Sequence, residues 1–281
     1  MIDYTAHLWT LMVDIVRRVP ALGFIDMREV LVFARYGRRR AGGALATCHA
    51  LDLPPSGPDR CTWTDRRSGR IVRQSEWFVA RSPEVRISGR RIRHLMSVAL
   101  PRFCDQTLDR AGKQDLYPDG APWLARLDTV VHELYHIDPG ADGIRRAVRT
   151  DGSRSRHAHG AAFYQDVAAM VRAYLATRPD PAIVDFLACD HRELTRRFGG
   201  VVGTTFRTYP SFPQRYLEAA DPQPGPPAGH QVRIRPHRQP TLYTEGDLRR
   251  RRFTARGRPQ PVDASGARAA PSPGAAPSSW S

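Results

Sequence analysis

The segment His132-Glu133-Leu134-Tyr135-His136 carries the residues best suited to chemistry in this chain. On an α-helix, side chains four residues apart project from the same face, so both imidazoles can bind one metal ion. The residue after the first histidine is displaced by about 100° around the helix axis. The Glu133 carboxylate is therefore placed to accept a proton from a water molecule instead of binding the metal. Two ligands and one base are what metal-assisted hydrolysis of an amide requires.

A third ligand must come from elsewhere in the chain. A catalytic zinc site has three protein ligands and an open fourth position. Four of the ten histidines lie between positions 132 and 159, and the two outside the motif are His157 and His159. Either one alone would be read as a solvated loop histidine, and the pair in the motif could be histidines without a metal. Beside a pair that lacks a third ligand, we expect one of the two to complete the site, and spacing alone does not choose between them.

Apolar spacing places the motif on a helix. Pro122 suits the first turn of that helix, and Pro139-Gly140 ends it. A second helix is expected over about 158–177, and a third from Asp180, as N-cap, to Gly199 just past its end. The apolar stripe of the motif helix consists of Leu124, Leu127, Val131 and Leu134.

The N-terminal part of the chain predicts a further helix and several strands. Residues 8–19 have helical apolar spacing, which Pro20 stops. Residues 54–70 are rich in Pro, Gly, Asp and Arg, which indicates a loop or a loose hairpin. We therefore expect one α+β domain over residues 1–220, with a small antiparallel or mixed sheet packed on the motif helix and the helices after it. Strands are predicted at 30–36, 76–80 and 92–100.

Composition changes near residue 220. The segment 221–281 holds 11 of the 24 prolines and 10 arginines, with few large apolar residues. Such a segment buries too little apolar surface to offset its ordering entropy, so we expect a disordered Pro/Arg-rich tail. Its run Arg249–Arg252 is interpreted as a solvated charge run, with a grip on nucleic acid as the alternative.

The charge balance favours polyanionic partners. Forty-three basic residues against 28 acidic ones give a formal net charge of +15, and Lys113 is the only lysine among them. A positive potential attracts phosphate backbones, so nucleic acid is a partner to consider through the basic surface and the tail. Biased codon usage is the alternative explanation, because the arginines are spread along the chain.

No membrane or secretory signal is evident in the sequence. No stretch approaches the 18 to 20 apolar residues, roughly, that a membrane-spanning helix needs. The first 20 residues carry four charges and lack the pattern of a secretory signal, so a soluble, cytoplasmic protein without a membrane partner is expected. The sequence specifies no oligomeric state. The cysteines at 48, 61, 104 and 189 form no C-x-x-C pair, which predicts free thiols and no zinc ribbon.

A family resemblance follows from two motifs together. The segment 132–136 (HELYH), followed by 159–163 (HGAAF), is similar to the SprT-like zincins, where His-Glu-x-x-His precedes a His-Gly-x-x-Phe that opens the next helix. The longer text HELYHIDPGADGIRR resembles a group of metallopeptidases of phages and bacteria. The resemblance covers about residues 90–178, roughly a third of the chain.

The resemblance implies a zincin-like fold and a set of roles. His132, His136 and His159 would be the zinc ligands, and Glu133 the general base. It also implies that the strand before the motif flanks the cleft, where an extended peptide could add to a sheet edge.

Three features bear on how far the resemblance extends. His159 is preferred over His157 because Gly160 and Phe163 complete the second motif. The linker between the second and third histidines is long and arginine-rich. The cysteine-pair zinc ribbon of some SprT-like proteins is absent, so a DNA-associated role does not carry over from them.

The sequence therefore predicts a Zn²⁺-dependent metallopeptidase that acts on protein or peptide. Two alternatives stay open: a basic nucleic-acid-associated protein with a mainly structural zinc site, and a metal-dependent hydrolase with another substrate. Glu133 favours an enzyme, because structural zinc sites close all four positions with Cys and His. Asp138 or Asp142 could orient a ligand histidine, although capping of the turn is the simpler role for an aspartate there. Candidates for stabilising an oxyanion are His157, Tyr164, Arg207 and Tyr209.

Overall fold

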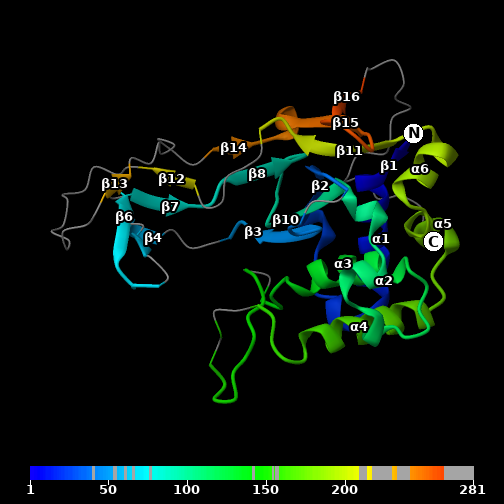
Figure 1. Ribbon diagram of the computed structural model, residues 1–281, viewed down its shortest axis with the longest axis horizontal. Helices are drawn as coiled ribbons and strands as arrows, with labels where there is room; N and C mark the ends of the chain where they lie inside the picture. Colours follow the sequence, from blue (N-terminus) through cyan, green and yellow to red (C-terminus); the bar gives the residue numbers. More distant parts are fainter. Residues whose placement is uncertain are drawn as a thin grey trace.

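The computed structural model combines six α-helices with several small sheets among the residues that it describes (Figure 1). This is the mixed helix-and-sheet architecture that the sequence predicted. The structure describes residues 1–262 except 40–41, 53–55, 60–61, 65–66, 76–77, 141–142, 154, 156–157, 209–213, 217–229 and 233–240.

The sheet that supports the motif has three strands. β2 (Val30–Gly37) runs parallel to β10 (His94–Pro101), and β3 (Ala46–Ala50) pairs antiparallel with the other side of β10. The sheet is therefore mixed, and its order is β2-β10-β3. The strand before the motif, β10, is central in this sheet, and β2 and β3 are its outer strands.

Alternation along the strands gives this sheet two apolar faces. Even-numbered side chains such as Val32 and Met96 join the core beneath the helices, whereas Phe33 and Leu95 belong to a second cluster on the other face. This is the period of two that places successive side chains on opposite faces of a strand. Both faces are covered near the start of β2, which explains its continuous apolar sequence.

Two helices, α1 (Tyr4–Arg18) and α3 (Leu124–Tyr135), contact one face of this sheet, and α4 (Phe163–Ala176) packs against α3. The three helices lie together on the lower side of the sheet in Figure 1. The first helix begins where the Asp3 side chain accepts a hydrogen bond from the Ala6 N–H, and it ends before Pro20. The three long helices predicted up to residue 177 are confirmed.

The helix predicted from Asp180 to Gly199 is interrupted. The chain forms α5 (Pro181–Val184), a 3₁₀ turn, and then α6 (His191–Phe198). The break arises because Cys189 is extended and Asp190 starts a new helix with a capping box: its side chain accepts from the Glu193 N–H. The predicted ends are confirmed, since Asp180 caps α5 and Gly199 adopts the left-handed conformation after α6.

The prediction of a disordered tail from residue 221 is wrong for residues 241–262. β15 (Leu248–Phe253) pairs antiparallel with β11 (Val201–Phe206), so the arginine run lies in a strand. The physical reason is that Phe253 is 2% exposed in the main core and β11 offers a free edge. Arg250 also forms an ion pair with Asp3, at 3.0 Å. The rest of the predicted tail lies outside the described residues, apart from β13 (His230–Val232).

The remaining strands are short. β5 and β6 pair antiparallel, which agrees with the loose hairpin expected near residue 70, and β7 lies where a strand was predicted. Several of these strands project to one side, away from the helices (Figure 1). Within the described residues, no helix has the length and apolarity to cross a membrane. The remaining elements are β1 (Ile2–Asp3), β4 (Ser56–Asp59), β5 (Thr62–Thr64), β6 (Ile71–Ser75), β7 (Phe78–Arg81), β8 (Glu84–Ile87), β9 (Arg90–Arg91), α2 (Leu108–Ala111), β12 (Gln214–Tyr216), β14 (Leu242–Tyr243) and β16 (Gln260–Pro261).

Replacing Phe253 tests whether the C-terminal strand is part of the fold. Phe253→Ala removes a buried ring and leaves a cavity, so we expect the free energy of unfolding to fall by about 3–5 kcal/mol. Arg249→Ala, at an exposed position of the same strand, should change it by about 0.5 kcal/mol at most. Urea unfolding followed by circular dichroism measures both. Equal stability of the two variants would contradict the placement of β15.

Candidate metal centre

The helix α3 brings two histidines to one face near its C-terminal end. Its apolar side chains Leu127, Val131 and Leu134 are fully buried, which fixes the rotation of the helix. His132 lies in the last turn, and His136 is the first residue after it, with its N–H donating to the His132 carbonyl at 3.2 Å. The helix end is held by Arg145, whose Nε donates to the Tyr135 carbonyl at 2.8 Å.

The third histidine comes from the segment just before α4. The first residue of α4 is Phe163, whose side chain is 4% exposed. Its ring packs against the His159 ring. The Phe163 ring centroid lies 4.9 Å from that of His132, 5.2 Å from that of His136 and 4.5 Å from that of His159. One buried aromatic ring thus packs against all three imidazoles and holds them together.

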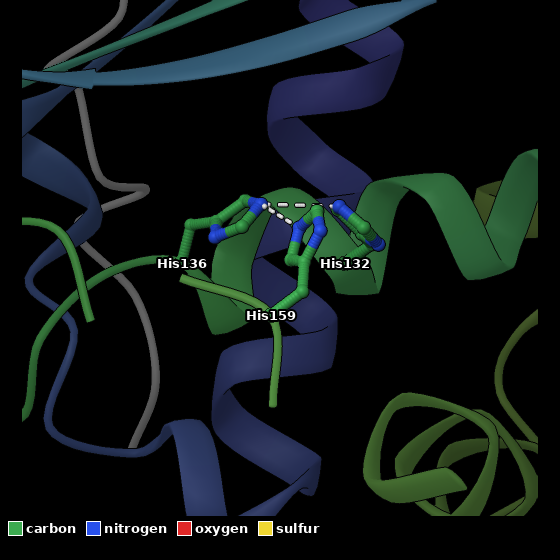
Figure 2. Close-up of side chains that lie close together, drawn as sticks. All are labelled: His132, His136 and His159. Atoms are coloured by element: carbon green, nitrogen blue, oxygen red, sulfur yellow. Dashed lines mark hydrogen bonds between the residues drawn. The ribbon is translucent and has the colours of Figure 1, made fainter. Parts of the chain in front are cut away.

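The three imidazoles converge on one point. The Nε2 atom of His136 lies 3.0 Å from that of His132 and 3.2 Å from that of His159. One ligand nitrogen from each residue lies within 4.8 Å of the others, which is close enough to hold a metal ion. Figure 2 shows the rings turned toward one another: His132 from α3, His136 from the residue that follows it, and His159 from the segment before α4. Metal–nitrogen bonds of about 2.0–2.1 Å in a tetrahedral site place ligand nitrogens roughly 3.3 Å apart, which these distances approach.

Burial keeps these imidazoles in the form that binds metals. Desolvation, with help from the neighbouring rings, lowers the pKa of His132 to about 3 and that of His136 to about 4. Burial also lowers the pKa of His159. The rings are therefore neutral at pH 7, and a neutral imidazole has the free lone pair that a metal requires.

The hydroxyl of Tyr164 lies at the outer side of His159. Its oxygen is 3.3 Å from His159 Nδ1. When the His159 Nδ1–H donates to this oxygen, the Nε2 lone pair is free for a metal, and the contact fixes the ring orientation. Tyr164 was one of the sequence candidates for stabilising an oxyanion, and its contact with His159 also makes it a candidate for positioning that ring.

Glu133 is buried between α3 and the edge strand. It is 6% exposed, and its carboxylate accepts a hydrogen bond from the backbone N–H of Cys48 in β3. Burial raises the pKa of Glu133 to about 8, and the Lys113 charge and the Cys48 hydrogen bond oppose this rise. Glu133 is not among the three residues whose ligand atoms cluster. The motif predicted a base that is separate from the metal ligands.

The lone lysine of the chain stands next to this site. Lys113 donates to Asp128, which also accepts a 2.7 Å hydrogen bond from the Tyr117 hydroxyl. Its charge reaches the motif, because it lowers the pKa values of both His132 and Glu133. Lys113 is recognisable in the sequence as the one lysine among 43 basic residues.

The other sequence candidates have different places. Asp138 accepts a 2.9 Å hydrogen bond from the Gly140 N–H and so caps the turn after the motif. Arg207 follows β11, where its N–H donates to the Asp247 carbonyl. The candidates outside the described residues are Asp142, His157 and Tyr209.

Cysteine chemistry takes no part in the cluster. Cys48, Cys104 and Cys189 are free thiols, as predicted, and Cys61 lies outside the described residues. Burial raises the pKa of the Cys104 thiol to about 12, so that thiol stays protonated and unreactive.

Comparison with known proteins adds no assignment. No family model, curated protein or solved structure matches this chain. The functional argument therefore depends on the residues of the site and their geometry.

Removing the Tyr164 hydroxyl should weaken metal binding. Tyr164→Phe keeps the ring and removes the hydrogen bond to His159 Nδ1, so we expect the affinity for Zn²⁺ to fall by about tenfold. Tyr135→Phe is the matched control, because its hydroxyl bonds to Asp166, at 3.0 Å, and to no imidazole. Competition with a chromophoric chelator measures both affinities. An unchanged affinity in Tyr164→Phe would remove the positioning role.

Proposed function

We propose that this protein is a zinc-dependent metallopeptidase with a zincin-like catalytic domain. The observation that carries the proposal is the convergence of three neutral imidazoles. A buried glutamate, Glu133, follows the first of them, His132, in α3. Three imidazole ligands suit Zn²⁺ and leave a fourth position open, which is the arrangement of a catalytic site. His132, His136 and His159 would hold the ion.

A bound zinc ion would supply Lewis acidity, which activates water at neutral pH and polarises a carbonyl. Glu133 is the proton carrier: an Oε atom takes a proton from the water that attacks the scissile carbonyl carbon. Glu133 then gives this proton to the amide nitrogen as the carbon–nitrogen bond breaks, which releases an amine and a carboxylic acid. The ionised form that this cycle needs is favoured by a cation at the imidazoles, which offsets the effect of burial.

The edge strand β3 favours an extended peptide as substrate. The Leu51 N–H donates to the Arg93 carbonyl, and the Leu45 carbonyl accepts from the Ala99 N–H, so odd-numbered residues of β3 bond to β10. In an antiparallel pair, the alternate residues then direct their backbone groups outward. Cys48 is one of these, and its N–H reaches Glu133. A peptide added along this edge would pass directly beside the proposed base.

Replacing the base separates hydrolysis from metal binding. Glu133→Gln keeps the side-chain shape and loses the proton acceptor, so we expect turnover of a casein substrate to fall by at least about 10³-fold. The zinc content should stay unchanged, because Glu133 is not a ligand. Glu29→Gln, at a position outside the cluster, is the control and should leave turnover unchanged.

Zinc content by mass spectrometry and release of acid-soluble peptides provide the two readouts. Full turnover by Glu133→Gln, with the wild-type protein active, would refute the proposed mechanism.

A further inference from the structure

Two adjoining cavities lie apart from the three imidazoles, with volumes of about 620 and 530 Å³. They open beside the segment that links β2 to β3, the start of the 3₁₀ turn after β10, and the turn between β15 and β16. Gly42 and Arg102 line both cavities, so the two are neighbours. Arginines dominate the walls: Arg35, Arg38, Arg102 and Arg258 in the first, and Arg39 and Arg110 added by the second.

Backbone carbonyls fix two of these guanidinium groups. Arg102, which is 7% exposed, donates to the carbonyls of Gly42 and Ala44, the latter at 2.6 Å. Arg35 donates to the same Ala44 carbonyl and, at 3.2 Å, to the Ser97 hydroxyl. A carbonyl acceptor orients a guanidinium without cancelling its positive charge. Carbonyls of the linker between β2 and β3 therefore orient two guanidinium groups at the cavities, one from β2 and one from the turn after β10.

Negative charge is scarce around this cluster. Asp105 is the one carboxylate among the described residues that line the cavities, and Arg39 already binds it. Arg38 and Arg258 are exposed and form no ion pair with any described carboxylate. Like charges that line one cavity repel one another, and a bound anion relieves the repulsion.

The wall is also open enough for an anion to approach. Gly37, Gly42 and Gly257 line the first cavity and add no side chains to it. A Cβ at Gly42 would meet no heavy atom within 4 Å, so there is open space at this position of the wall. Both volumes fall in the range of about 300–1,000 Å³ that is typical of small-ligand sites.

We propose that these two adjoining cavities bind the phosphate groups of a polyanion. Guanidinium groups match phosphate oxygens through paired N–H donors, and Arg is favoured over Lys where such planar recognition matters. Two adjoining cavities that share Arg102 suit phosphates in series better than a single anion. This chemistry is common to a free polyphosphate and to a nucleic acid strand. The inference is independent of the proposed peptidase activity.

Binding to two probes tests the proposal on the full chain. Sodium pyrophosphate is titrated by calorimetry, and a fluorescein-labelled ten-residue oligothymidylate by anisotropy at two salt concentrations. We expect at least one probe to bind, and Arg38→Gln/Arg258→Gln to weaken that binding at least tenfold. If the strand binds, the slope of log affinity against log salt should become shallower by about 1.4 in this variant, because it neutralises two fewer phosphates. Binding of pyrophosphate identifies the free-polyphosphate source, and binding of the strand alone identifies nucleic acid.

Matched variants separate a site from general positive charge. Arg17→Gln/Arg90→Gln removes two exposed charges that line neither cavity, and it should weaken binding less than twofold. Gly42→Asp puts a carboxylate at a position that lines both cavities and should abolish binding, whereas Gly42→Ala should preserve it. Absence of binding by both probes would overturn the proposal, and so would equal weakening in the two double-arginine variants. Circular dichroism confirms that each variant is folded.

Discussion

Three imidazole nitrogens held within 4.8 Å of one another impose the constraint on which the rest of this structure depends. Such an arrangement requires neutral rings, because protonated imidazoles would repel one another and lose the lone pair. Burial meets that requirement by lowering the pKa values of His132 and His136 far below 7. It also requires the end of α3 and the segment before α4 to keep their relative positions, since a small shift of either would separate the nitrogens.

Packing in the core keeps these two segments in place. α3 is locked by its buried stripe against the sheet, and α4 is locked by residues such as Val167 and Val171 in the same core. Phe163 joins the two helices at the imidazoles themselves. The edge strand β3 closes the other side and holds Glu133 through the Cys48 N–H. Ligands and proposed base thus belong to one packed body, which is the preorganisation that a metal site needs.

The local features of the site could be predicted from the sequence, because they depend on short-range periodicity. The i, i+4 spacing of His132 and His136 and the apolar stripe determine the helix face without any long-range information. His159 is preferred over His157 only through the second motif; the cluster contains His159, and His157 lies outside the described residues. The edge position of β3 was not predicted, because strand order depends on pairing between residues about 50 positions apart.

The errors in the sequence analysis have a common physical origin. The charge of Arg249–Arg252 predicted a solvated segment. In the structure this run pairs with β11 through backbone hydrogen bonds, and the adjoining Phe253 is buried in the core. Tertiary pairing of this kind overrides composition. The break between α5 and α6 was missed for a related reason, since the Asp190 capping box competes with continuation of a helix whose ends were correctly predicted.

Metal analysis of the purified protein is the most direct measurement of the central claim. Mass spectrometry should find about one zinc per chain in the wild-type protein. The control variant His49→Ala should also keep it, because His49 lies in β3 and is not part of the cluster. His132→Ala and His159→Ala should each lose the metal while they remain folded. A wild-type protein that binds no metal when supplied with zinc, or a His159→Ala variant that retains it fully, would contradict the account.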